Sequence, residues 1–198
     1  FHGRGLTEAH FTAAVGGVEI IEMAARAFLG PGDAAIVCPP TFGWYVSTLK
    51  RQGAEIISVP LDAAQFDHDV DAILAAVTDQ TRLIFICNPH NPTGAMMTAA
   101  DMDRLVNELP PHVTIVADEV YHHFVERRDY PDSLARVLKG ANVIIIHSFS
   151  KAYGLAGLRL GYAIARPDLI ERIVALKRPF HHSSLVLAAG IAALQDQD

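Results

Sequence analysis

Lys151 carries the side chain best suited to covalent chemistry, because a primary amine can condense with an aldehyde. It follows the apolar run Val143–Ile146, and a lysine beyond the carboxyl end of a buried strand faces a pocket in open α/β sheets. Arg159, eight residues later, offers a planar fork of donors that suits a phosphate, and Ser148 offers a nearby hydroxyl. Together they indicate a phosphorylated aldehyde as ligand, whereas Lys151 alone would more often be part of a basic loop.

Two further apolar runs end in polar groups. The run 82–87 stops at Asn88–Gly94, a stretch whose prolines and glycine predict a rigid turn. The run 113–117 stops at Asp118, with the phenol of Tyr121 three residues later. Taken singly, Asn91 is more often a turn former and Asp118 more often a helix cap. Beyond neighbouring parallel strands, however, these groups are expected to face one ligand.

The order of these motifs resembles a known family. Asn91–Gly94 reads Asn-Pro-Thr-Gly, 118–121 reads Asp-x-x-Tyr and 148–151 reads Ser-x-x-Lys, followed by Arg159. From about residue 12 to the end, the chain resembles the fold-type I enzymes that use pyridoxal 5′-phosphate (PLP), specifically the class I/II aminotransferases. The stretch 150–162 is most similar to the histidinol-phosphate aminotransferase branch.

The resemblance implies a role for each residue around the cofactor ring. Lys151 would hold PLP as an internal aldimine and then act as the base that moves a proton from the substrate α-carbon. Asp118 would pair with the protonated pyridine nitrogen and keep the ring an electron sink. Asn91 and Tyr121 would hydrogen-bond the ring hydroxyl oxygen. Phe42 matches the aromatic residue that stacks on the ring, although it could equally be a core residue.

The resemblance also implies a phosphate-binding group. Arg159 and Ser148 would grip the phosphate, with Ser150 as a third member. Gly17 and Val18 open a predicted helix, where backbone N–H groups can bind an anion. A helix-capping turn would have the same sequence pattern.

Strand and helix patterns alternate along the chain, which predicts a mostly parallel sheet covered on both faces, a three-layer α/β sandwich. The resemblance implies that this is the fold of the PLP-dependent transferase large domain. The predicted buried strands are Ala35–Cys38, Ile56–Val59, Leu83–Cys87, Val113–Ala117 and Val143–His147. The predicted helices are Val18–Leu29, Gly43–Gln52, Val70–Val77, Ala99–Leu109 and Asp168–Lys177. The resemblance implies that a further strand, Gly161–Ala165, runs antiparallel.

Composition restricts the class of protein. The 198 residues are 51% hydrophobic, which suits one domain with a sizeable core. The chain has 22 acidic and 16 basic side chains and no basic block, so nucleic acid is not an expected partner. The apolar runs are too short to span a membrane.

Cysteine and histidine usage adds further expectations. Cys38 and Cys87 each close an apolar run, which favours buried free thiols and a reducing cytoplasm. The histidines lack metal-ligand spacing, so no metal is expected. His181 and His182 either line the substrate pocket or form a surface turn.

The resemblance implies that residues 1–198 are the PLP-binding large domain, without the N-terminal arm and the C-terminal small domain of its relatives. The first residues show no initiator methionine and no secretion signal, which fits a chain that begins within a longer protein. Relatives are homodimers with active sites at the subunit interface. Their small domain supplies an arginine for the substrate carboxylate or phosphate.

The expected function is transfer of an amino group between an amino acid, or an amino-alcohol phosphate such as histidinol phosphate, and a 2-oxo acid. A PLP-dependent carbon–sulfur lyase or decarboxylase on the same fold is an alternative, because these reactions share their first step. A PLP-binding effector domain of a transcriptional regulator is another. A plain dinucleotide-binding domain is disfavoured, because no Gly-x-Gly-x-x-Gly follows a strand.

Overall fold

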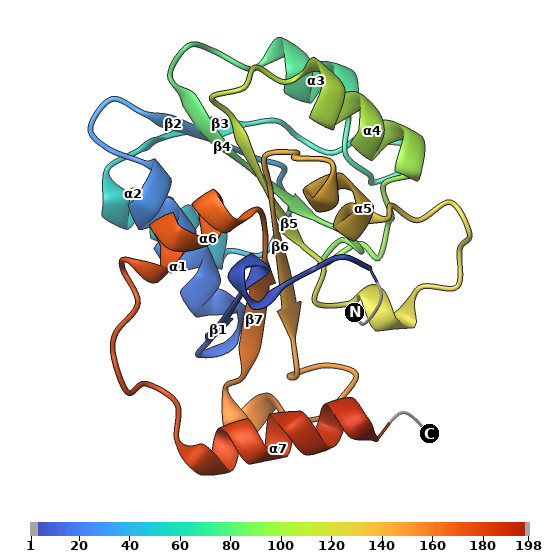
Figure 1. The fold of residues 1–198 in the computed structure, drawn as a ribbon. Coiled ribbons are helices and arrows are strands. Elements are labelled where there is room, and N and C mark those ends of the chain that lie inside the picture. Colours follow the sequence, from blue (N-terminus) through green and yellow to red (C-terminus); the bar gives the residue numbers. More distant parts are fainter. Residues whose placement is uncertain (1–3, 197–198) are drawn as a thin grey trace.

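The chain folds around one mixed sheet of seven strands in the order β1-β7-β6-β5-β4-β2-β3, as the computed structural model of residues 4–196 shows (Figure 1). The strands are β1 Phe11–Ala14, β2 Ala34–Val37, β3 Glu55–Ser58, β4 Thr81–Cys87, β5 Thr114–Asp118, β6 Val143–Ser148 and β7 Gly161–Ile164. Strands β2 to β6 pair in parallel, while β7 pairs antiparallel with both β6 and β1. The predicted mostly parallel sheet and its antiparallel strand are confirmed.

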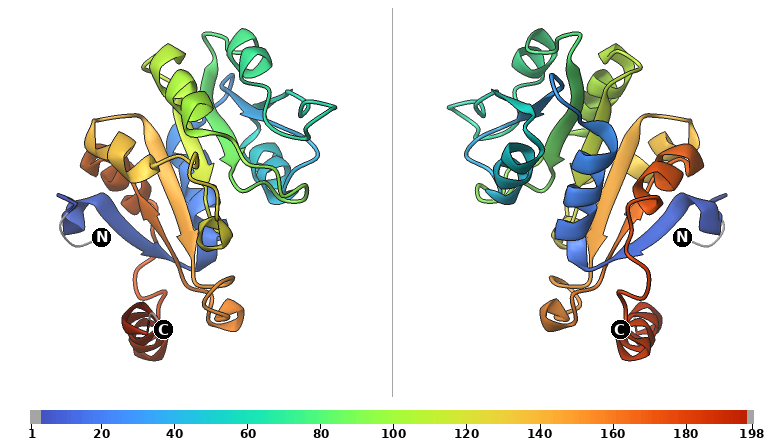
Figure 2. Two further views of the ribbon diagram at one scale, coloured as in Figure 1. Left: turned by 90° about the vertical axis from the view of Figure 1, so that its right-hand side faces the viewer. Right: turned by 90° about the vertical axis from the view of Figure 1, so that its left-hand side faces the viewer.

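Helices cover both faces of this sheet (Figure 2). On one face lie α1 Gly16–Phe28, α2 Trp44–Gln52 and α6 Pro167–Val174, and on the other lie α3 Val70–Ala75, α4 Ala99–Glu108 and α5 Ser133–Leu138. The central strands are apolar throughout because their alternate side chains enter different cores: Ile144 and Ile146 pack under α1, whereas Ile145 packs on the opposite side. This arrangement is the predicted three-layer sandwich.

The structure corrects the expectation that Ile56–Val59 is a buried strand. Strand β3 lies at the edge of the sheet, with Glu55 and Ser58 exposed and Ile56 and Ile57 only partly buried. An edge strand has one neighbour instead of two, so less of its surface is covered. Other predicted bounds agree within a few residues, and α6 ends at Val174, before the predicted Lys177.

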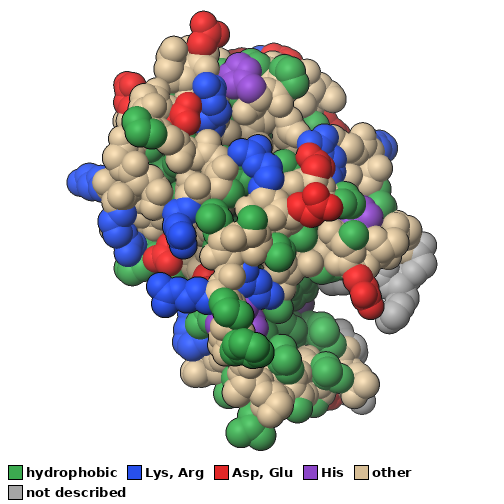
Figure 3. Space-filling model, turned by 60° about the vertical axis from the view of Figure 1, so that its left-hand side comes forward, with side chains coloured by type: hydrophobic (Ala, Val, Ile, Leu, Met, Phe, Trp, Pro, Cys, Tyr) green, Lys and Arg blue, Asp and Glu red, His purple; other side chains and the backbone are tan. Residues whose placement is uncertain are grey.

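Helix α7, Ser184–Gln195, was not predicted. It stands apart from the sheet layers at the end where β6 terminates (Figures 1 and 2), and it exposes apolar side chains, including Leu185 at 80% and Ile191 at 58%. Hydrophobic side chains gather over the lobe at the lower end in Figure 3, where this helix lies. Because α7 is apolar on all sides, it gives no amphipathic period to recognise. Among residues 4–196, no helix is both long and apolar enough to cross a bilayer.

Candidate active site

A cavity of about 210 Å³ lies where β4, β5 and β6 end, beside the start of α1. Every predicted site residue contributes to its wall: Gly17, Val18, Phe42, Asn91, Asp118, Tyr121, Ser148, Ser150, Lys151 and Arg159. The parallel strands bring these groups together because their carboxyl ends meet at one edge of the sheet. Ile21, Cys87, Val120 and Ala156 also line the cavity and were not predicted.

Asp118 is the buried acid of this cavity. It is only 5% exposed, and its Oδ2 accepts a hydrogen bond of 2.6 Å from the phenol of Tyr45. The Val120 N–H approaches Oδ1 at a longer distance of 3.4 Å. Burial raises the pKa of Asp118 to about 6, because the ionised form loses its hydration and the two hydrogen bonds offset this only in part. A cation bound at Oδ1 would stabilise the ionised form.

Tyr45 hydrogen-bonds the buried acid of the cavity, and sequence reasoning missed it. Its ring is 1% exposed, stacks on Phe85 at 5.0 Å between ring centroids and meets the edge of Phe42 at 5.6 Å. Burial raises the pKa of its phenol well above the usual range, so the hydroxyl remains a donor to Asp118. A signal was present, because Tyr45 lies three residues after Phe42 at the start of a predicted helix, where such residues share a face.

Tyr121 lies between the amide of Asn91 and the amine of Lys151. The Asn91 Nδ2 and the Tyr121 hydroxyl oxygen are 3.5 Å apart, and the Lys151 Nζ lies 5.1 Å from the centroid of the Tyr121 ring. The backbone N–H of Asn91 points at the sulfur of buried Cys87, at 3.4 Å. These contacts place two hydrogen-bonding groups beside the amine. Lys151 is exposed, so it lines the cavity at its open side.

The opposite part of the cavity is suited to an anion. Helix α1 has no side-chain cap at Val15, so the N–H groups of its first turn, at Gly17 and Val18, remain available to a ligand. Arg159 Nη1 contacts the Ser150 hydroxyl at 3.4 Å and the Ala156 carbonyl at 2.9 Å. The Ser150 N–H donates to the Ser148 hydroxyl at 3.0 Å.

Gly16 makes this anion site possible. It has φ of +74°, and a Cβ atom at this position would lie 2.4 Å from Nη2 of Arg159. The guanidinium therefore packs directly against the backbone at the start of α1. The positive φ favours glycine at this position, and any larger residue would force the Arg159 guanidinium to move.

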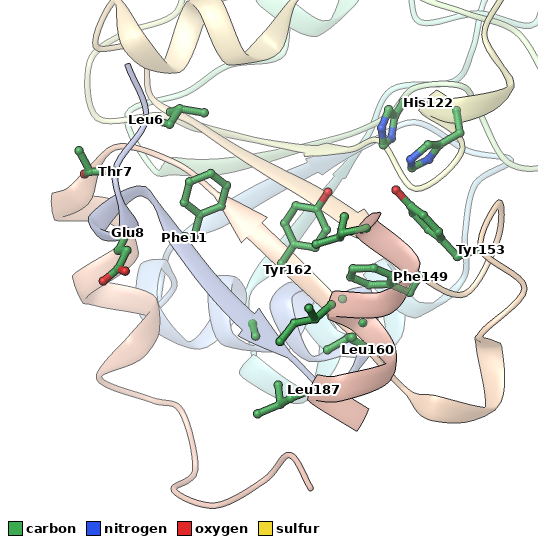
Figure 4. A pocket seen from close by; sticks show the side chains of 16 residues that line it. Leu6, Thr7, Glu8, Phe11, His122, Phe149, Tyr153, Leu160, Tyr162 and Leu187 are labelled. Carbon is green, nitrogen blue, oxygen red and sulfur yellow. The ribbon is translucent and has the colours of Figure 1, made fainter. Parts of the chain in front are cut away.

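His181 and His182 do not reach this cavity. They line a separate hollow of about 350 Å³ with Lys177, Arg178 and Phe180. Both are partly buried, and Nε2 of His181 lies 3.7 Å from Oε2 of Glu19 in the first turns of α1, so the two predicted alternatives stay open. A larger cavity, of about 790 Å³, is not lined by Lys151 either: it lies between α7 and the sheet, with Phe11, Phe149, Leu160 and Leu187 on its wall (Figure 4).

Comparisons with known proteins agree with this geometry. The model of the family described as "Aminotransferase class I and II" matches residues 6–198. The histidinol-phosphate aminotransferase of Moorella thermoacetica is 44% identical over 180 residues, which is 90% of this chain and 46% of that protein. Histidinol-phosphate aminotransferase 2 of Ralstonia nicotianae is 41% identical over 98% of this chain and 51% of its own length. The chain thus spans about half the length of the curated relatives it matches.

Solved structures show the same relationship. Histidinol-phosphate aminotransferase from Sinorhizobium meliloti, solved in complex with pyridoxal-5′-phosphate, superposes with a TM-score of 0.90 at 29% identity, covering 98% of this chain and 52% of that one. Aspartate aminotransferase from Rhizobium meliloti superposes with a TM-score of 0.84 at 30% identity, covering 94% and 48%. The family resemblance inferred from the motifs is confirmed.

Proposed function

The chain belongs to the class I and II aminotransferase family, and from that membership we propose that residues 1–198 form the cofactor-binding large domain of a PLP-dependent aminotransferase. The observation that carries this proposal is the single cavity in which Lys151, Asp118 and Arg159 meet. An amine, a buried acid and a guanidinium are the three groups that an aldehyde, a pyridine nitrogen and a phosphate require. The N-terminal arm and small domain of full-length relatives would complete the enzyme.

The cavity fits the cofactor at both ends. At one end, Oδ1 of Asp118 accepts only a long hydrogen bond, of 3.4 Å, from the Val120 N–H. Because burial destabilises the ionised carboxylate, a cationic partner at Oδ1 would stabilise it. At the other end, Arg159, Ser148 and Ser150 would hold the phosphate together with the first turn of α1. The guanidinium of Arg159 occupies the space that a Cβ atom at position 16 would fill.

PLP, when bound, supplies an aldehyde that captures an amine and a ring that withdraws electrons from the substrate α-carbon. Asp118 would keep a proton on the ring nitrogen, because an ionised carboxylate in a dry site stabilises the adjacent cation. Asn91 and Tyr121 would orient the ring through its hydroxyl oxygen, and Phe42 would cover one ring face. Lys151 Nζ would take the proton from the α-carbon and deliver it to the cofactor's aldehyde carbon.

For the substrates, we propose an amino acid, or an amino-alcohol phosphate such as histidinol phosphate, as amino donor and a 2-oxo acid as acceptor. The support is that the similar proteins named above are histidinol-phosphate and aspartate aminotransferases. The same similarity disfavours a carbon–sulfur lyase, a decarboxylase or a regulator's effector domain.

A homodimer and a cytoplasmic location are part of the same proposal. The apolar side chains of α7, including Leu187 and Ile191, would be covered by a second subunit or by the small domain. Cys38 and Cys87 are both buried free thiols, which favours a reducing compartment.

Borohydride reduction tests the proposal directly. The chain is incubated with PLP, reduced and digested, and we expect the modified peptide to contain Lys151. A Lys151→Ala variant that yields the same amount of reduced adduct would refute the assignment. To separate the reactions, the full-length protein is given a donor amino acid: a transaminase converts bound PLP to its pyridoxamine form, whereas a β-lyase releases pyruvate and a thiol.

A further inference from the structure

Glu119 and His147 form a buried pair on the face of the sheet opposite to Asp118. Successive side chains of a strand point to opposite faces, so Asp118 opens into the Lys151 cavity while Glu119 points away from it. Glu119 is 5% exposed and His147 3% exposed. The Glu119 Oε2 lies 3.2 Å from Nε2 of His147, a residue of the neighbouring strand β6.

This pair belongs to a chain of hydrogen bonds in which the donor of each bond can be assigned. Ser133 donates its hydroxyl to Oε1 of Glu119, and the Tyr162 hydroxyl lies 3.0 Å from Nδ1 of His147. Burial lowers the pKa of His147 to about 3, so the imidazole is neutral. It then donates from Nε2 to Glu119 and accepts at Nδ1 from Tyr162. Tyr162 forms part of the wall of the larger cavity (Figure 4), where this chain ends.

The backbone of Glu119 is hydrogen-bonded as well as its carboxylate. Its N–H donates to the Ile146 carbonyl at 3.0 Å, and its own carbonyl lies 2.7 Å from Nδ1 of His122. The His122 ring stacks on His147 with 3.8 Å between centroids. Glu119 is thereby fixed by contacts from β6, η2 (His122–Phe124) and α5.

We propose that Glu119 and His147 are positioning residues for the cofactor site, which they support from the opposite face of the sheet. Glu119 lies in the turn between Asp118 and Tyr121, the two groups that meet the nitrogen and the hydroxyl oxygen of the ring. Holding Glu119 in place therefore fixes the distance between the Asp118 and Tyr121 side chains and the direction in which each points. The inference rests on the proposed function, because it concerns how the cofactor is held.

Glu119 also acts on Asp118 through its charge. Burial raises the pKa of Glu119 to about 7, and its ionised carboxylate in turn raises the pKa of Asp118. The titratable and charged groups around Glu119, besides Asp118, are His122, Tyr130, Asp132, Arg136, His147 and Tyr162. The pair therefore affects two separable quantities: the geometry of the turn, and the repulsion on Asp118 at pH values where both carboxylates are ionised.

Titrations of the 198-residue chain with PLP across pH 5 to 9 distinguish these two quantities. In Glu119→Ala and in His147→Phe, we expect cofactor affinity to fall roughly tenfold at pH 8, since a buried hydrogen-bond partner is lost. Glu119→Gln keeps the side-chain shape and its hydrogen-bonding capacity, so it should restore affinity at pH 8. The acidic midpoint of binding should stay where it is in wild type, because Glu119, with a pKa of about 7, is already largely protonated near pH 6, where Asp118 ionises.

Thr114→Val is the matched control, because Thr114 is buried at the opposite end of β5 and does not line the cavity. It should leave affinity and midpoint unchanged. If wild type binds PLP but the Glu119 and His147 variants bind it equally well with the same midpoint, the pair has no positioning role and the proposed function stands. The same conclusion holds if those variants lose only thermal stability. If wild type itself does not bind PLP, the proposed function fails and this inference with it.

Discussion

The phenol of Tyr45 and the carboxylate of Asp118 are joined by a hydrogen bond of 2.6 Å, although the two residues are 73 positions apart in the chain. Tyr45 belongs to α2 and Asp118 ends β5, so the contact links a covering helix to the edge of the sheet where the strands terminate. The bond occupies Oδ2, whereas Oδ1 has only the longer contact of 3.4 Å from the Val120 N–H. The bond from Tyr45 also lowers the pKa of Asp118 and so favours the ionised form of the acid.

Removal of this phenol should make cofactor binding more sensitive to acid. In Tyr45→Phe the ring still packs on Phe85, but Asp118 loses a donor that lowers its pKa. The carboxyl then becomes neutral at a higher pH and cannot pair with a protonated ring nitrogen. We expect PLP affinity about tenfold lower near pH 6 and a smaller deficit at pH 8. Fluorescence titrations at both pH values measure this; an equal deficit at both would contradict the electrostatic explanation.

Asp118→Asn should stabilise the cofactor-free chain while weakening cofactor binding. The folded pKa of Asp118 is about 6, above the value of roughly 4 for an unfolded aspartate. Above pH 6 the acid is ionised in both states, and the cost of burying its charge is fully present. The neutral amide removes this cost, so the free energy of unfolding should rise by roughly 1–3 kcal/mol at pH 8.

Below pH 4 the acid is protonated in both states, and the gain should disappear. Urea denaturation of the wild type and the Asn variant at pH 8 and near pH 4 provides the measurement. A variant less stable than wild type at pH 8 would show that the carboxylate contributes hydrogen bonding that outweighs its desolvation. PLP titration of the same samples should show the loss of affinity.

Gly16→Ala should displace Arg159 and weaken binding through the phosphate. Gly32→Ala is its matched control: both glycines have positive φ, +74° and +85°, but a Cβ at Gly32 meets no atom within 4 Å. Both variants should lose about 1 kcal/mol of stability from backbone strain. Only Gly16→Ala should bind PLP more weakly while binding phosphate-free pyridoxal as before. Equal PLP affinity of the two variants would argue against an anion site at the start of α1.

The sequence predicted the cavity wall well because strand ends are locally encoded. Asp118 and Ser148 each follow an apolar run, and parallel strands place such residues side by side without further information. Tyr45 was missed because its role depends on how α2 packs across the sheet. Glu119 and His147 were missed for a related reason: only the pairing of β5 with β6 brings them together.

Elements at the margins of the fold were the least predictable. Strand β1 has only four residues, Phe11–Ala14, and exists through its pairing with β7. Helix α7 lacks a polar face, and the apolar pair Ile56 and Ile57 of β3 resembles part of a buried strand. Local patterns report which residues are apolar but not which neighbour covers them.

Acid should destabilise the chain partly through His90, a residue of the turn that holds Asn91. His90 is 3% exposed, and burial, reinforced by the nearby His68, lowers its pKa to about 4. An unfolded histidine titrates near 6.5, and the unfolded state therefore binds the proton first as the pH falls. The free energy of unfolding is therefore highest above about pH 6.5, where this histidine is neutral in both states. It falls as the pH drops towards 4, by roughly 1–3 kcal/mol for this group. The Thr93 hydroxyl donates to the Phe66 carbonyl and so accepts from Nδ1 of His90. His90→Asn keeps a donor for Thr93 and cannot be protonated, so its free energy of unfolding should fall less between pH 7 and pH 4.5 than that of wild type. Exposed His112 provides the control, because His112→Asn should leave the pH dependence unchanged. Parallel curves for wild type and His90→Asn would mean that the imidazole takes up its proton without leaving the folded turn.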